Sequence, residues 1–178
     1  FMLVEMPLIQ HFILFLDQPA YALTAVLFCI LLFSGLGSRY GSQRVSRNVA
    51  FALLIIILVL ELFLLPHLLH ALLGLSLLAR SAVTLLLIAP IGFLMGIPFP
   101  SGLAWIESSP IKASHLNTQW MTAWVWAVNG ASSVVASILA SLLSLSFGFR
   151  LTLGIGIVCY ALAWIAIKKL DKAENNQE

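Results

Sequence analysis

Charged residues are scarce in this sequence. Asp, Glu, Lys and Arg make up only 9% of its 178 residues, whereas hydrophobic residues make up 61%. An ordinary soluble domain carries about 25% charged residues, so this composition excludes that class and indicates a protein whose solvent is the lipid bilayer. The net charge is only +2, and no basic patch with interleaved aromatic residues occurs, so nucleic acid is not an expected partner.

Motifs for catalysis and metal binding are also missing. The two cysteines, Cys29 and Cys159, each lie in an apolar stretch, where a thiol behaves as a small hydrophobic group. The sequence contains no P-loop, no Rossmann glycine motif, no nucleophile–base pair and no Cys/His cluster with metal-ligand spacing. We therefore expect no catalytic residue, no cofactor and no metal site in this chain.

The sequence begins with Phe1 and is apolar from its first residues. A cleaved secretory signal is not expected, because no basic segment precedes the apolar run and Glu5 interrupts it. We interpret the sequence as a piece of a longer protein whose upstream part is missing.

A series of long apolar segments fills most of the chain. A helix rises about 1.5 Å per residue, so about 20 apolar residues cross the hydrocarbon core of a membrane. This ruler predicts an all-α fold, a polytopic membrane bundle of about six transmembrane helices within residues 1–167, followed by a cytoplasmic tail at 168–178. The predicted spans are about 1–16, 20–37, 48–65, 77–94, 120–145 and 151–167.

Turn-forming and helix-breaking residues separate these spans. Asp17-Gln18-Pro19 and Phe147-Gly148-Phe149 are typical of tight turns. Pro66 is expected to stop the third span, because proline lacks an amide donor. The other predicted connections are an Arg-rich polar loop at 38–47, an interfacial connector at 67–76 and a polar loop at 107–119.

The stretch Gly96-Ile97-Pro98-Phe99-Pro100-Ser101-Gly102 interrupts regular helix, because it holds two prolines and two glycines. One interpretation is a plain helix end near the cytoplasmic surface. The other is an interrupted helix of the kind that lines transporter cavities, where irregular backbone is tolerated beside water or protein. We favour the plain helix end.

The distribution of basic residues predicts the orientation. Of the nine Lys and Arg residues, only Arg80 and Arg150 fall on one side of a six-span arrangement. The other side collects Arg39, Arg44, Arg47, Lys112, Lys168, Lys169 and Lys172. The positive-inside rule then places the 38–47 loop, the Lys112 loop and the C-terminus in the cytoplasm, and a bacterial inner membrane is the expected location.

Carboxyl groups within the bilayer are candidate functional groups, because each costs about 2.5–3.5 kcal/mol on insertion scales. Glu5 lies about 12 residues before the Asp17 turn, which is close to mid-depth. We expect it to face the bundle interior, either as a protonatable or substrate-contacting group or as a structural group bonded to a neighbouring helix. Gln10 is a second candidate contact, although helical rotation places it on a different face from Glu5.

Three other polar residues have a weaker claim to function. Glu61 lies about four residues from the predicted outer end of its span, where its side chain can reach the interface. His67 and His70 are three residues apart, a spacing found in metal sites, but no third or fourth ligand is evident. We interpret both histidines as surface residues.

Asn129 is the third candidate substrate contact. It lies near mid-depth in the fifth span and begins a series of small polar residues at helical spacing: Ser133, Ser137, Ser141 and Ser144. Such a seam favours close helix packing, with hydroxyl groups bonding across the gap. The tryptophans at the start of this span, Trp120, Trp124 and Trp126, are typical of an aromatic belt at the cytoplasmic interface.

These residues give the chain a resemblance to the membrane portion of bacterial spermidine synthase-like proteins, in which a polytopic membrane region is fused to an aminopropyltransferase-like domain. The resemblance spans most of the chain, and its motifs are mostly apolar. The stretches that carry it, in order, are Phe1 to Gln10, Leu31 to Ser38, Gly96 to Pro100, Trp124 to Ser133, and Phe147-Gly148-Phe149.

The resemblance implies an upstream Rossmann-like domain that binds decarboxylated S-adenosylmethionine and a diamine. None of that domain's glycine-rich or acidic binding residues has a counterpart here, so no catalytic residue is carried over. The lipid bilayer and this upstream domain are the expected partners, and the sequence does not indicate an oligomeric state.

A second resemblance concerns Gly35 to Arg44, which is similar to the short cytoplasmic loop between the second and third helices of major facilitator transporters. Ser38 stands where that pattern expects an acidic residue. Two functions follow as hypotheses: the membrane domain of a spermidine synthase-like protein that anchors it and binds or passes a small substrate, or half of a major-facilitator-like transporter using Glu5 and Asn129. An anchor without a ligand is the third hypothesis.

Overall fold

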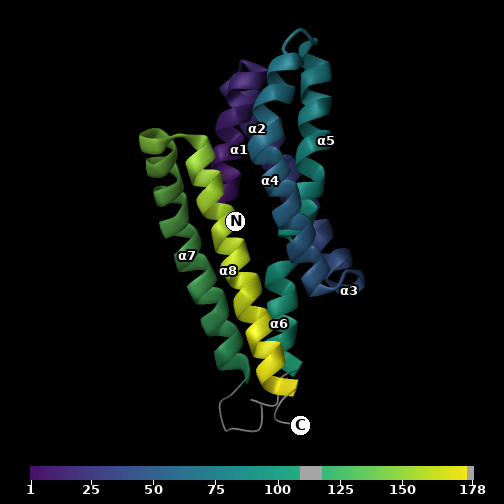
Figure 1. Cartoon of the computed structure of the whole chain (residues 1–178), viewed down its shortest axis with the longest axis vertical. Coiled ribbons are helices and arrows are strands. Elements are labelled where there is room, and N and C mark those ends of the chain that lie inside the picture. Colours follow the sequence, from purple (N-terminus) through teal and green to yellow (C-terminus); the bar gives the residue numbers. More distant parts are fainter. Residues whose placement is uncertain (109–117, 176–178) are drawn as a thin grey trace.

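The computed structural model describes residues 1–108 and 118–175, and all regular structure within them is helical (Figure 1). The segments are α1 (Met2–Leu16), α2 (Pro19–Leu36), the π-helical turn η1 (Gly37–Gly41), α3 (Ser42–Arg44), α4 (Arg47–Ala71), α5 (Leu77–Met95), α6 (Pro98–Ser108), α7 (Thr118–Phe147) and α8 (Phe149–Asn175).

The predicted all-α membrane fold is confirmed. Within the described residues, five helical stretches are long and apolar enough to cross a bilayer, and Met2–Leu16 is a shorter apolar helix. The five stretches are Pro19–Arg44, Arg47–Ala71, Leu77–Ile106, Trp120–Phe147 and Phe149–Lys169. The protein is therefore an integral membrane protein built from helices.

Both predicted tight turns are confirmed, and they lie at the same end of the bundle (Figure 1). Asp17 adopts a left-handed conformation with φ 56°, and its amide donates to the carbonyl of Ile13 at 3.1 Å, which closes α1. Pro19 then starts α2, where its missing amide costs nothing. Gly148 separates α7 from α8 with φ 85°, a conformation that glycine adopts without strain.

Two predicted interruptions are wrong. Residues 38–44 continue the second span as η1 and α3 instead of forming a loop, and only Val45 and Ser46 are extended before α4 begins. Pro66 does not stop the third span, because α4 continues to Ala71. A membrane helix tolerates proline where neighbouring groups compensate for the lost backbone bond.

The C-terminal boundaries also differ from the prediction. Helix α8 continues to Asn175, well past the expected end of its span at residue 167. The expected polar loop at 107–119 is helical at its two ends, where α6 reaches Ser108 and α7 starts at Thr118. Residues 109–117, with Lys112, and residues 176–178 of the predicted tail lie outside the described residues.

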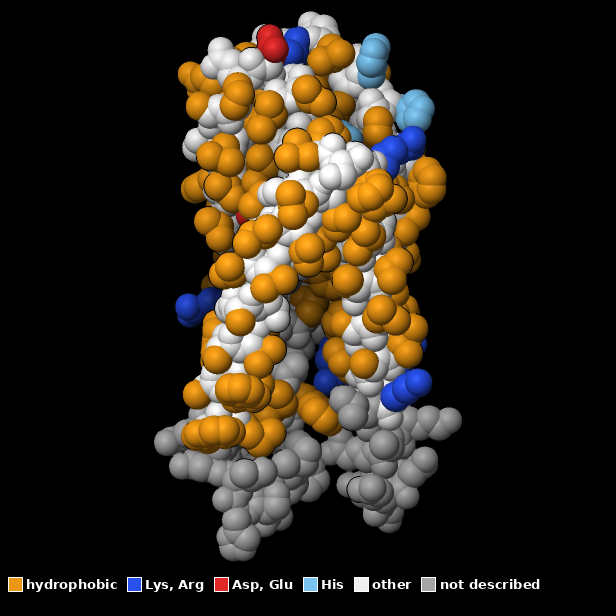
Figure 2. Space-filling view, turned by 90° about the vertical axis from the view of Figure 1, so that its left-hand side faces the viewer, with side chains coloured by type: hydrophobic (Ala, Val, Ile, Leu, Met, Phe, Trp, Pro, Cys, Tyr) orange, Lys and Arg blue, Asp and Glu red, His pale blue; other side chains and the backbone are white. Residues whose placement is uncertain are grey.

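Helix α1 occupies the centre of the bundle. It packs against α2, α4, α5, α7 and α8, and Figure 1 shows it between the α2–α4–α5 group and the α7–α8 pair. Its side chains Val4, Leu8, Phe12 and Phe15 are almost fully buried. The peripheral helix α7 instead exposes most of its apolar side chains, and Figure 2 shows hydrophobic groups over the face that carries α7 and α8.

Glycines allow α2 and the following turn η1 to touch the backbone of α5. Gly37 lies directly against the carbonyl oxygen of Phe93, and Gly96 lies against the carbonyl oxygen of Ser34. A methyl group on Gly92 would sit 3.2 Å from the Cα of Ile30. Gly37 and Gly41, like Gly92 and Gly96, are four residues apart, and this spacing favours close helix packing in membranes. This contact anchors the end of α5 beside the bend that follows.

Arg80 joins three segments at the end of the bundle that holds the tight turns. Its guanidinium donates to the carbonyl of Phe15 at 3.1 Å, to that of Leu75 at 3.0 Å and to that of Leu73. The group also lies 5.9 Å from the ring centroid of Phe15. Arg80 thus bonds carbonyls that the end of α1 and the α4–α5 turn leave without helical partners.

We expect Arg80→Gln to lower the free energy of unfolding by about 1–3 kcal/mol, because charged hydrogen bonds to these carbonyls are lost. Arg150→Gln is the matched control, since Arg150 is an exposed arginine at the same end of the bundle. Thermal unfolding of the detergent-purified variants, followed by tryptophan fluorescence, measures the difference. Equal melting temperatures for the two variants would refute a bracing role for Arg80.

Candidate functional site

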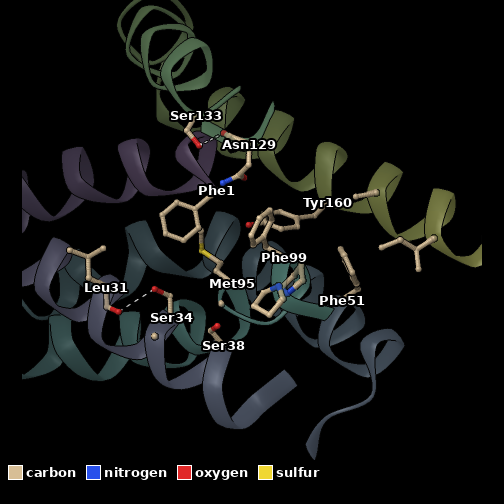
Figure 3. A pocket seen from close by; sticks show the side chains of 16 residues that line it. Phe1, Leu31, Ser34, Ser38, Phe51, Met95, Phe99, Asn129, Ser133 and Tyr160 are labelled. Carbon is tan, nitrogen blue, oxygen red and sulfur yellow. Dashed lines mark hydrogen bonds between the residues drawn. The ribbon is translucent and has the colours of Figure 1, made fainter. Parts of the chain in front are cut away.

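A cavity of about 630 Å³ lies beside the break between α5 and α6. Its walls come from the start of α1 and from α2, η1, α4, α5, α6, α7 and α8, so most of the bundle contributes (Figure 3). The lining residues are Phe1, Leu31, Ser34, Gly35, Ser38, Phe51, Met95, Gly96, Pro98, Phe99, Pro100, Asn129, Ser133, Tyr160, Ala163 and Ile167.

The interrupted helix forms one wall of this cavity. Helix α5 ends at Met95, and α6 resumes at Pro98 after only Gly96 and Ile97. The favoured interpretation of this stretch as a plain helix end is therefore wrong, and the alternative of an interrupted helix beside a cavity is correct. The helix resumes at once because Pro98 occupies its first position, where a missing amide is tolerated.

Hydrogen bonds and aromatic contacts fix the start of α6. The backbone amide and the hydroxyl of Ser101 both donate to the carbonyl of Ile97, at 3.2 Å and 2.8 Å. Phe99 meets Trp126 of α7 edge to face, with ring centroids 4.8 Å apart. This aromatic pair links α6 to α7 at the edge of the cavity.

The polar side chains of the cavity are uncharged. Asn129 projects from α7 toward Phe1, and Tyr160 reaches in from α8 beside Phe99 (Figure 3). The hydroxyl of Ser34 donates to the carbonyl of Leu31 at 3.2 Å, and that of Ser133 donates to the carbonyl of Asn129 at 2.8 Å. None of the lining side chains in the described part of the chain belongs to Asp, Glu, Lys or Arg.

Three of the serines on α7 bond within their own helix instead of across a gap. Ser133, Ser137 and Ser141 donate to the carbonyls of Asn129, Val134 and Ser137 at 2.8, 2.8 and 3.0 Å. Ser144 is buried, and its hydroxyl has no hydrogen-bond partner among the residues that the structure describes. The predicted bonding across this seam is therefore wrong for the first three serines.

The three candidate contact residues do not share one site. Asn129 lines the cavity, but neither Glu5 nor Gln10 does. Glu5 is buried with an exposed fraction of 3%, which agrees with the expectation that it faces the bundle interior. Gln10 is half-buried, and its side-chain oxygen finds no partner within the described ranges. A function for any of the three stays a prediction.

Glu61 is far more buried than its sequence position suggests. Because α4 passes through Pro66 and ends at Ala71, Glu61 lies ten residues, or about 15 Å, from the helix end. Its exposed fraction is 8%, and both carboxyl oxygens have no hydrogen-bond partner among the residues described. The expectation that this side chain reaches the membrane surface is wrong, because it depended on a helix that stopped at Pro66.

The histidines form no metal site within residues 1–108 and 118–175, where no group of three or more His, Cys, Asp or Glu side chains could hold a metal ion. The His11 and His67 rings each bond a carbonyl of their own helix, at 3.2 Å to Pro7 and 3.0 Å to Phe63. The rings of Trp120 and Trp124 stack 6.0 Å apart and are exposed, as the predicted aromatic belt requires.

Comparison with known proteins assigns no family to this chain. No protein-family model, no curated protein and no solved structure matches it.

Proposed function

We propose that this chain is a membrane-embedded binding domain. It anchors a spermidine synthase-like protein in the membrane and holds a small uncharged molecule in the cavity beside the α5–α6 break. The observation that carries the proposal is the convergence of the resembling stretches on this cavity. Leu31 to Ser38, Gly96 to Pro100 and Trp124 to Ser133 lie far apart in the sequence, yet all three contribute lining residues, as does Phe1.

The chemistry of the lining favours an uncharged ligand. The cavity offers one amide, from Asn129, and hydroxyl groups from Ser34, Ser38, Ser133 and Tyr160, with aromatic and aliphatic walls. A diamine with two positive charges would lose its hydration shell there without gaining a carboxylate partner, which is unfavourable. The two buried carboxyl groups, Glu5 and Glu61, lie outside the cavity lining.

The reaction implied by the resemblance suggests one such ligand. When a sulfonium donor gives up its aminopropyl group, the sulfur loses its positive charge, and an uncharged adenosine thioether remains. That product combines a flat aromatic base with hydroxyl groups, which suits a cavity of about 630 Å³ bounded by Phe99, Tyr160 and Asn129. The domain would then remove or retain the product of chemistry performed elsewhere.

The basic residues support a cytoplasmic position for the proposed upstream domain. Arg39, Arg44 and Arg47 flank the connection between the second and third spans, and Lys168 and Lys169 lie on α8 near the end opposite the tight turns. The positive-inside rule places this end in the cytoplasm, which for a bacterial inner membrane is the compartment that contains polyamines and the sulfonium donor.

Binding of 5′-methylthioadenosine to the detergent-purified chain tests the cavity. We expect saturable binding that Asn129→Ala weakens about twofold to twelvefold, the effect of losing one hydrogen bond worth about 0.5–1.5 kcal/mol. Ser141→Ala is the matched control on the same helix, because Ser141 lies outside the cavity lining. Putrescine should not bind there, and tighter binding of putrescine than of the nucleoside would contradict the proposal.

The anchoring role has a separate test. Membranes that contain the product of the full-length gene should consume decarboxylated S-adenosylmethionine only when a diamine is added. A folded full-length protein without this activity would remove the spermidine synthase-like assignment and leave the cavity with a different ligand.

The interrupted helix supports a second candidate, half of a small-solute transporter. Broken helices beside a cavity are typical of transporters, and α5–α6 has this form. The transporter hypothesis from the sequence uses both Glu5 and Asn129 in a central cavity. Of these two residues, only Asn129 lines the cavity. Uptake of a solute into vesicles that contain the reconstituted full-length protein, without any aminopropyl transfer, would favour transport.

A further inference from the structure

A groove of about 310 Å³ lies between α4 and α5 on the lipid-facing side of the bundle. Its walls are leucines, isoleucines and Pro90, and Glu61 is the only ionisable residue among the residues that line it. Leu60, Leu64 and Leu86 bound the groove and are 51%, 56% and 76% exposed. In a membrane these exposed leucines contact lipid tails, so the groove is reached from the bilayer.

Glu61 lies along this apolar groove, and its carboxyl group is buried without a partner among the described residues. Both of its oxygens are buried and accept no hydrogen bond from any residue that the structure describes. An unpaired carboxyl group at this depth is costly, and such groups in membranes normally have a partner or a ligand. The ligand that satisfies a carboxylate best is a cation that donates hydrogen bonds.

Pro90 leaves a backbone carbonyl of α5 without its usual helical hydrogen bond. Proline has no amide hydrogen, so the carbonyl of Leu86, four residues earlier in α5, cannot accept the usual helical bond from residue 90. Leu86 and Pro90 both line the groove beside Glu61. A primary ammonium group has three donors, more than the carboxylate alone needs to be satisfied.

We propose that this groove binds a lipophilic primary amine from the bilayer. The ammonium group pairs with the Glu61 carboxylate, and the alkyl chain lies along Leu60, Leu64 and Leu86. A hydrophilic dication would give up its hydration without apolar contact, and a neutral lipid tail would leave Glu61 unpaired. The site is separate from the cavity at the α5–α6 break and does not depend on the function proposed for that cavity.

Carbodiimide labelling in phosphatidylcholine nanodiscs tests the site. Dicyclohexylcarbodiimide is apolar, and a carboxyl O–H adds across its C=N bond to give an O-acylisourea that rearranges to a stable N-acylurea, so the whole reagent stays attached. Mass spectrometry of the peptide that contains Glu61 measures this addition together with the decylamide that forms where decylamine displaces dicyclohexylurea from the O-acylisourea, so that both products count as labelling. We expect Glu61 to be labelled and Glu5, which lines none of the described cavities, to be labelled far less.

Decylamine and decanol then separate an amine site from a general lipid groove. At ten times its dissociation constant, decylamine should slow labelling of Glu61 about tenfold, because about one site in ten stays empty. Decanol, which has the same chain length and no charge, should leave the labelling rate unchanged. Equal protection by decanol, or no labelling of Glu61 at all, would overturn the proposal.

Glu61→Gln tests the carboxylate without relying on labelling. The substitution keeps the shape of the side chain, and no described residue loses a bond to it, so the fold should persist. Decylamine should raise the melting temperature of the unchanged chain and of Asn129→Ala, but not that of Glu61→Gln. An equal rise in the melting temperature of Glu61→Gln would overturn the proposal. Loss of nucleoside binding in Asn129→Ala would bear only on the function proposed for the cavity at the α5–α6 break.

Discussion

Gly37→Ala is expected to prevent α2 and α5 from packing and to lower the yield of folded protein sharply. The new methyl group would meet the backbone carbonyl of Phe93, and a backbone atom cannot turn aside as a flexible side chain can. Overpacking of this kind costs about 1–3 kcal/mol, and more where the backbone itself must shift. Gly96→Ala should behave in the same way, because its methyl group would meet the carbonyl of Ser34.

Gly35→Ala provides the matched control. Gly35 lies in the same continuous helical stretch, Pro19–Arg44, but nothing comes within 4 Å of a methyl group placed there. Alanine should even favour the helix at this position, by about 0.5–1 kcal/mol. Size-exclusion chromatography in detergent, followed by titration with sodium dodecyl sulfate, measures folded yield and stability. If Gly37→Ala were as stable as Gly35→Ala, the backbone contact between α2 and α5 would not exist.

The double variant refines this test. Gly37 and Gly96 serve one interface, so once the first methyl group has separated α2 from α5, the second should cost little more. We expect the destabilisation of Gly37→Ala combined with Gly96→Ala to be clearly smaller than the sum of the single effects. Additive effects would indicate that the two glycines act at independent contacts.

Phe12→Ala is expected to lower the free energy of unfolding by about 3–5 kcal/mol, the usual range when a buried phenylalanine is truncated. Phe12 is fully buried on the central helix and meets Phe15 edge to face, with ring centroids 6.2 Å apart. Its removal leaves a void among helices that α1 holds together, and rigid helices close such a void poorly.

Leu14→Ala is the control for Phe12→Ala, because Leu14 is two residues away on the same helix and is 69% exposed. Its truncation should change the unfolding free energy by less than about 0.5 kcal/mol. Circular dichroism during denaturation by sodium dodecyl sulfate compares the two variants. Similar losses for both would mean that α1 does not form the core of the bundle.

Much of this fold could be predicted from hydropathy and turn chemistry. The Asp17 and Gly148 turns follow from residues whose backbone preferences are strong, and the structure confirms both. The exception at Pro66 has a physical cause: in water a proline often ends a helix, but in a membrane an exposed backbone end is so costly that the helix continues. Helix ends inferred from proline are therefore unreliable in an apolar segment.

The candidate site was harder to predict, because it depends on contacts between distant segments. Asn129 could be placed at mid-depth, but nothing local indicates that it shares a cavity with Phe99 and Tyr160. On sequence alone Glu61 had only a weak claim to function, because the predicted helix end at Pro66 lay too close to it. The helix in fact continues to Ala71. The paired glycines were visible as two four-residue spacings, Gly37 to Gly41 and Gly92 to Gly96, and this signal could have identified the α2–α5 contact.

The central position of α1 has a consequence for how the protein is made. Helix α1 precedes its partners α7 and α8 by more than 100 residues, so a ribosome that adds about 5–20 residues per second produces them many seconds later. Until then α1 has only α2, α4 and α5 beside it, and the face of α1 that α7 and α8 will cover stays open to lipid or to the insertion machinery. Helix α1 is thus synthesised before its partners α7 and α8 but completes its packing only after they have been made.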